Sequence, residues 1–271
     1  MGFEKIVRDE SRKYVPIDDP LFCKMAEDRS FCEEILKVFL DDPELVVLKN
    51  QPQFTVKNLK GRSVVLDCYC KLCGGRLVNV EVQKENNDDS QRRMRYNSSV
   101  LTANVTKRRT KFRDLPDIYS IFVSRFDVFK KGLTTYHIDR VIRETGDVVD
   151  NGQREIYVNA AVNDGSRIAE LMEVLTKENA YNDCFPRTSA LKYRYRETEE
   201  GEKEMCEISE RLVNYGKQAG KKEGLKEGQN IINMLNQFLI SENRMDDLVR
   251  ATKDKTYQAC LIKEMQASKR R

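Results

Sequence analysis

The chain has 271 residues and a net charge of +4, with 39% hydrophobic and 34% charged residues. This length suits one large domain, with or without an appendage, and the composition is that of a soluble globular protein with a charge-rich surface. No apolar run approaches the roughly 20 residues of a membrane helix, and the N-terminus lacks the apolar core of a signal peptide, so we expect a cytoplasmic protein with no membrane partner.

The N-terminal part of the chain predicts an arm followed by a helix. Residues 1–17 are expected to be extended, and Asp18-Asp19-Pro20 is a typical start for a helix that continues through Leu40. An apolar stripe recurs in this helix at 100° per residue: Cys32, Ile35, Leu36, Phe39 and Leu40. Glu33 flanks the stripe and can reach the edge of a sheet, whereas Glu34 lies nearly opposite the stripe and is expected in solvent.

Two segments with a period of two, joined by Cys73-Gly74-Gly75, predict a β-hairpin that follows a strand over 53–57 and a turn over 58–62. A three-residue loop here pairs residues whose numbers sum to 148, so Asp67 lies opposite Glu81. On the first strand, one face is expected to carry Val64, Leu66, Cys68 and Cys70. On the second strand, one face is expected to carry Val78, Val80 and Val82, and the other Asn79, Glu81 and Gln83.

The opposed carboxylates of Asp67 and Glu81 suggest a metal site. Directly opposed residues have Cβ atoms about 4.5–5.5 Å apart, and two carboxylates at that distance repel unless a cation lies between them. Mg²⁺ prefers oxygen ligands, and Gln83 reaches the same face. The alternative is an outward strand face whose polar side chains are only solvated.

The eight cysteines are scattered, as is typical of reduced thiols in a cytosolic protein. Cys68, Cys70 and Cys73 come nearest to a zinc cluster. Structural zinc needs four ligands in paired spacing, and His137 is the one histidine of the chain, so the sequence favours free thiols over zinc.

The next segment predicts a helix over residues 91–106 after a loop over 86–90, with Met94, Val100, Leu101 and Val105 inside. Strands are expected over 117–124, 134–141 and 155–162, and a helix over 167–178. This order of elements predicts an α/β (α+β) fold around one mixed sheet flanked by helices.

A block of eight basic residues without an acidic one occupies positions 91–113. Its members are Arg92, Arg93, Arg95, Lys107, Arg108, Arg109, Lys111 and Arg113. Beside a metal site, such a block indicates a polyanionic partner, and DNA is the expected one. The alternative is that these side chains pair with carboxylates elsewhere on the surface.

The remainder of the chain, residues 211–271, is expected to be a glycine-repeat linker and a helical tail. Glycine recurs every four residues at positions 216, 220, 224 and 228. One interpretation is a helical stripe that allows a second helix to approach closely, and hence a homo-oligomer formed through this region. The other is a frayed tether, because each glycine costs a helix about 1 kcal/mol.

Several of these motifs together resemble the PD-(D/E)xK nuclease superfamily, and most closely its "PD-(D/E)xK nuclease family transposase" group, which is related to recombination-promoting nucleases. The resemblance covers residues 18–210 and includes Arg95-Tyr96, Tyr136-His-Ile-Asp-Arg140, Ile156-Tyr-Val-Asn159 and Glu197-Thr-Glu-Glu-Gly201. It implies a restriction-endonuclease-like fold, here with a charged helical C-terminal extension.

The resemblance also implies functional residues. Asp67 and Glu81 match the metal ligands, Glu33 the helix carboxylate, and Gln83 the position of the superfamily's lysine. Leu66 stands where the motif has proline, and Asn97 where relatives often have a second tyrosine. The residues expected to contact nucleic acid are Arg92, Arg93, Arg95, Tyr96, Lys107, Arg108 and Arg109.

The implied activity is hydrolysis of DNA phosphodiester bonds by an endonuclease that uses Mg²⁺ or Mn²⁺, with little sequence specificity and a link to recombination or mobile elements. Gln83 cannot supply the positive charge of a lysine, which leaves open recruitment of another cation such as Arg93. It also leaves open an alternative function, a weak or inactive protein that binds DNA or a partner.

Overall fold

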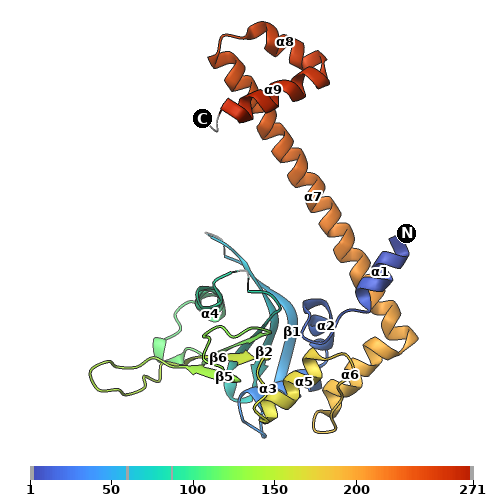
Figure 1. Cartoon of the computed structure of the whole chain (residues 1–271). Helices are drawn as coiled ribbons and strands as arrows, with labels where there is room; N and C mark the ends of the chain where they lie inside the picture. The colour runs from blue at the N-terminus through green and yellow to red at the C-terminus, as the bar shows by residue number, and fades with distance from the viewer. Residues whose placement is uncertain (1–2, 59–60, 87, 269–271) are drawn as a thin grey trace. The chain divides into compact units, whose positions relative to one another are not determined.

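The computed structural model describes residues 3–58, 61–86 and 88–268, which divide into two compact units, residues 1–209 and 210–271 (Figure 1). The elements follow in the order α1 (Phe3–Ser11), α2 (Asp19–Met25), α3 (Arg29–Phe39), β1 (Val47–Val56), β2 (Val64–Leu72), β3 (Leu77–Gln83), α4 (Ser90–Val105), β4 (Ile118–Ser124), β5 (Thr135–Ile138), β6 (Gln153–Asn159), α5 (Arg167–Thr176), α6 (Pro186–Glu197), α7 (Glu199–Ser241), α8 (Met245–Lys253) and α9 (Lys255–Ser268).

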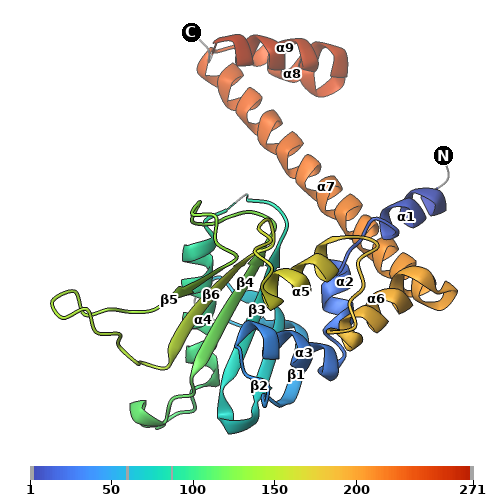
Figure 2. The same ribbon diagram turned by 60° about the horizontal axis from the view of Figure 1, so that its bottom comes forward.

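The first unit is built on one mixed sheet, as predicted, with strand order β1-β2-β3-β4-β6-β5. The pairs β3–β4 and β4–β6 are parallel and the other three are antiparallel. α4 lies on one face of the sheet, and α2, α3 and α5 lie on the other (Figures 1 and 2). Both faces of the central strands are therefore covered, which buries β3 almost completely.

The hairpin register agrees with the prediction from loop length. Cys68 pairs with Val80 and Tyr69 with Asn79, and each pair of numbers sums to 148. Gly74 and Gly75 have φ of 83° and 88°, so the loop uses the left-handed region that glycine enters without strain. The described residues leave out Leu59, Lys60 and Asn87, on which the predicted turn and loop partly fall.

The predicted faces of β2 are wrong, because the strand changes its buried face at Asp67. Leu66 packs in a cluster with Leu101 of α4, whereas Cys68 belongs to the larger cluster on the opposite side of the sheet. Gln53 lies across from Asp67 on β1 and has a left-handed φ of 48°. This backbone distortion coincides with the change of face, and a strict period of two cannot show it.

Two predictions for the N-terminal part are also wrong. The arm contains helix α1, and Arg8 of this helix and Arg12 beyond it form ion pairs with Glu202. The single helix expected over 18–40 is two helices, because the Asp28 side chain caps a new one by accepting hydrogen bonds from the Ser30 and Phe31 amides.

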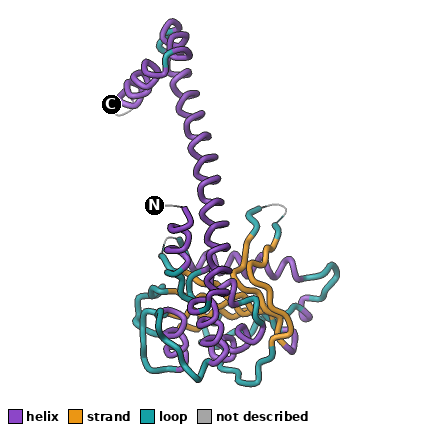
Figure 3. Tube along the Cα trace, turned by 90° about the vertical axis from the view of Figure 1, so that its right-hand side faces the viewer, coloured by secondary structure: helices purple, strands orange, loops and turns teal. Residues whose placement is uncertain are grey.

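The second unit begins inside α7, which runs without interruption through the glycine repeat (Figure 3). The frayed-tether interpretation is therefore wrong, while self-association through this region stays a prediction. A small apolar core joins the end of α7 to α8 and α9, with Leu235, Leu239, Ala251, Leu261 and Met265 buried. None of the described helices is long and apolar enough to cross a membrane.

A buried lysine fastens α6 to the end of α5. Lys192 is fully buried, and its ammonium donates to the carbonyls of Val174 (2.8 Å), Lys177 (2.5 Å) and Ala180 (2.7 Å). We expect Lys192→Met to lower the free energy of unfolding by about 2–4 kcal/mol, because it leaves three carbonyls without this donor. Urea unfolding measures the loss. Lys177→Met is the control, because it removes only an exposed ion pair with Glu173. It should change the free energy of unfolding by less than about 0.5 kcal/mol.

Candidate functional site

Two acidic side chains lie close together on β2 and β3. The register places Asp67 opposite Glu81, just beyond the paired residues Cys68 and Val80. The Asp67 carboxylate accepts a hydrogen bond from the Val82 amide at 2.8 Å. Burial, followed by the negative charge of Glu81, raises the pKa of the Asp67 carboxyl well above its ordinary value. Both causes disfavour the ionised form of Asp67.

Glu81 is enclosed by hydrogen-bond donors rather than by water. Its side chain is fully buried, and its Oε1 accepts from Asn79 Nδ2 (3.0 Å) and Asn97 Nδ2 (3.2 Å). Its Oε2 accepts from the Arg93 guanidinium at 3.0 Å. Burial raises the pKa of Glu81, although Arg93 acts in the opposite direction. The alternative of a solvated strand face is therefore wrong, because α4 covers this face.

Arg93 bridges the two polar residues at the end of β3. One of its terminal nitrogens donates to Glu81 Oε2 and the other to Gln83 Oε1, both at 3.0 Å. The Gln83 amide nitrogen donates in turn to the Glu85 carbonyl at 3.1 Å. This arrangement fixes a positive charge directly beside the glutamine, and the first turns of α4 supply it.

Asp19 lies close to this pair, although in the sequence it is only part of a helix start. The Cys23 thiol donates to Asp19 Oδ1 (3.2 Å) and to the Asp67 carbonyl (3.7 Å), so the start of α2 lies beside β2. The charge of Asp19 also contributes to the raised pKa of Asp67, after burial and Glu81. Asp19 is exposed and lines an open cleft of about 310 Å³ that also includes Gln83.

The structure does not bring Glu33 to the site, which corrects the expectation from the helical wheel. Its carboxylate accepts a hydrogen bond from the Val47 amide (3.0 Å) and pairs with Lys37 (3.1 Å). Val47 pairs with Leu72, five residues along β2 from Asp67, or about 16 Å in an extended strand. Glu34 is not in solvent either, since it accepts hydrogen bonds at the start of α6.

The basic block is divided between the two ends of α4. Arg92 pairs with Asp89 and Arg95 is exposed, and both lie on the first turns of α4 on either side of Arg93 in the sequence. Tyr96 donates to the Arg62 carbonyl at 2.5 Å, so its hydroxyl holds the turn after β1. The exposed residues Lys107, Arg108 and Arg109 lie just beyond the other end, about 20 Å from Arg93 along the helix.

The donor chemistry fits a divalent cation. Ionised Asp19, Asp67 and Glu81 outweigh the one positive charge of Arg93 by two negative charges. Carboxylate oxygens have two lone pairs each, so Glu81 Oε2 and Asp67 Oδ2 keep one beyond the hydrogen bonds described above. Oxygen donors of this kind suit Mg²⁺ and Mn²⁺. Within the described ranges, however, no three carboxylate groups bring one oxygen each within 4.8 Å of one another.

Comparison with known proteins gives one finding. A family model described as "PD-(D/E)XK nuclease family transposase" matches residues 25–162, about half of the chain. The match spans the acidic pair, Gln83 and Arg93, and it begins after Asp19. No match was found among curated proteins or among solved structures.

Proposed function

The chain belongs to the family of PD-(D/E)XK nuclease family transposases, and from this premise we propose that it is a metal-dependent endonuclease that hydrolyses DNA phosphodiester bonds. Its six-stranded mixed sheet flanked by helices is a restriction-endonuclease-like α/β fold. The observation that carries the proposal is the opposed Asp67–Glu81 pair, with Glu81 fully buried and Asp67 half-buried, because holding carboxylates of like charge together away from water costs free energy that a merely structural role does not require.

The proposed ion is Mg²⁺, with Mn²⁺ as a substitute, and Asp67, Glu81 and Asp19 would hold it. When bound, such an ion polarises a phosphoryl oxygen and lowers the pKa of a bound water. In this proposal Gln83 would orient the attacking water through its amide. Arg93 contributes a fixed positive charge beside Gln83, the charge that a lysine would otherwise contribute.

The remaining proposed contacts hold DNA without reading its sequence. Arg92, Arg95 and Tyr96 would contact the backbone from the first turns of α4, the part of the helix that also carries Arg93. Lys107, Arg108 and Arg109 would contact the phosphate backbone further along. Contacts to phosphates fix orientation and carry no sequence information, so the proposed enzyme has little specificity. A link to recombination or mobile elements follows from the family alone.

Nicking of supercoiled plasmid tests this function. We expect nicking with Mg²⁺ or Mn²⁺ that EDTA abolishes. In Glu81→Gln and Asp19→Asn the nicking rate should fall by about 100-fold or more. Glu33→Gln is the matched control, because it removes one carboxylate of the same unit outside the site, and it should stay within about twofold of the wild type. Metal-independent plasmid retardation without nicking would instead support the binding-only alternative.

The role of Arg93 gives a separate prediction. Arg93→Gln should lower the nicking rate by about 10- to 100-fold, Arg93→Lys should keep much of it, and added guanidinium ion should partly restore the Arg93→Gln variant. Because Arg93 lowers the pKa of Glu81, its removal should also move the acid limb of the pH–rate profile to higher pH. An unmoved acid limb would show that Arg93 acts only by packing.

A further inference from the structure

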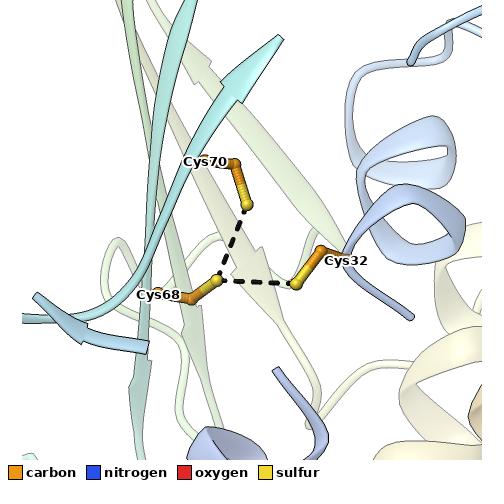
Figure 4. Close-up of side chains that lie close together, drawn as sticks. All are labelled: Cys32, Cys68 and Cys70. Atoms are coloured by element: carbon orange, nitrogen blue, oxygen red, sulfur yellow. Dashed lines mark hydrogen bonds between the residues drawn. The ribbon is translucent and has the colours of Figure 1, made fainter. Parts of the chain in front are cut away.

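Three thiols meet in the core of the first unit, on the side of the sheet away from α4. Cys32 comes from the first turns of α3, and Cys68 and Cys70 come from β2 (Figure 4). The Cys68 sulfur lies 3.7 Å from each of the other two, and all three sulfurs lie within 4.8 Å of one another. All three side chains are fully buried. We call this group the thiol triangle.

The dimensions of the thiol triangle match those of a metal–thiolate centre. A point equidistant from three sulfurs with these separations lies about 2.1–2.4 Å from each, and a metal–thiolate bond is about 2.3 Å long. We propose that the thiol triangle binds one soft metal ion in three-coordinate geometry. The site is independent of the proposed nuclease function, and its sulfur ligands differ from the oxygen ligands of the acidic pair.

The number of donors selects the ion. Structural zinc sites have four ligands, and within the described part of the chain no fourth Cys, His, Asp or Glu joins the three thiols. The Ala26 carbonyl oxygen, which contacts the cluster, already accepts from Asn50 Nδ2 (2.7 Å) and from the Cys32 thiol (3.4 Å). Soft thiolates in threefold coordination suit Cu(I), which is the ion proposed.

Binding would join α3 to the strand that carries Asp67, since Cys68 is the next residue. Each thiol that becomes a thiolate ligand releases its proton to solvent, and copper remains Cu(I), so no oxidant is needed. Because the sulfurs are fully buried, the ion would enter during local opening or folding of the first unit.

The test uses the full chain, reduced and kept free of oxygen. The folded chain is titrated with Cu(I) in competition with a chromophoric Cu(I) chelator. In a second route, Cu(I) is added while the chain refolds from urea. We expect one ion per chain and a rise in Tm of about 5 °C or more on loading. Cys32→Ala, Cys68→Ala and Cys70→Ala should each weaken binding at least about 100-fold. Cys73→Ala, an exposed cysteine of the same hairpin, should leave it unchanged.

X-ray absorption of the loaded wild-type chain keeps the test decisive where an alanine variant fails to fold. Three sulfur neighbours at about 2.3 Å support the proposal. Two or four sulfur neighbours, no bound copper after either loading route, or tighter binding of Zn²⁺ than of Cu(I) would overturn it.

Discussion

Asp67→Asn should slow cleavage severely and make the protein more stable. We expect the metal-dependent nicking rate to fall by about 100- to 1,000-fold, because an amide binds Mg²⁺ far more weakly than a carboxylate. Burial and the charge of Glu81 raise the pKa of Asp67, so the ionised carboxylate destabilises the folded state. Asparagine keeps an oxygen that can accept the Val82 amide, and without the charge we expect a gain of about 1–3 kcal/mol in the free energy of unfolding.

The sign of this effect depends on pH. The folded state holds the Asp67 proton more tightly than the unfolded state, so wild-type stability falls as pH rises from the unfolded pKa through the folded one. Asparagine does not titrate, and the gain in Asp67→Asn should therefore be small near pH 4 and grow toward neutral pH. Urea unfolding in EDTA at several pH values measures it. A gain that does not change with pH would show that the carboxylate charge is not its source.

Glu33→Gln provides a control of opposite sign. Burial opposes ionisation of Glu33, but the Val47 amide and Lys37 outweigh it and lower the pKa of this carboxyl. Its stabilisation is present above the unfolded pKa and is lost as pH falls through the folded pKa. Glu33→Gln should therefore be slightly less stable than the wild type at neutral pH, by less than about 1 kcal/mol because the group is partly exposed.

The acidic pair illustrates what a sequence can determine. Loop length sets hairpin register, so the opposition of Asp67 and Glu81 needed only the three residues at 73–75 and the alternation on either side. The burial of β3 was harder to foresee, because it depends on α4 lying over that face. Asn97 shows the same limit: in the sequence it only replaces a tyrosine, whereas in the fold it donates to Glu81.

The distance of Glu33 from the acidic pair has a different cause. A helical wheel gives the direction in which a side chain points around its axis, but not where the helix lies along a strand. Asp28 starts a second helix, which moves Glu33 to the far end of β1 and leaves Asp19 beside Asp67. The Asp-Asp-Pro signal was correct for a helix start, but it cannot show that the same aspartate faces an acidic strand.

Gly201→Ala adds a single methyl group, and we expect it to destabilise the first unit strongly. Gly201 lies in the first turn of α7, where a Cβ would overlap the Arg194 carbonyl oxygen and lie 2.6 Å from the Tyr195 Cα. Both neighbours are backbone of α6, so relief requires the end of α6 and the start of α7 to separate. We expect the free energy of unfolding to fall by about 3 kcal/mol or more, measured by urea unfolding.

Gly216→Ala makes the same change fifteen residues further along α7, and it isolates the cause. Nothing lies within 4 Å of a Cβ at Gly216, so alanine should only improve helix propensity, by up to about 1 kcal/mol. A loss in Gly201→Ala together with a neutral or favourable effect in Gly216→Ala would identify close packing of α6 against α7 as the requirement for glycine. Equal effects at both positions would instead attribute the loss to helix propensity and contradict the packing argument.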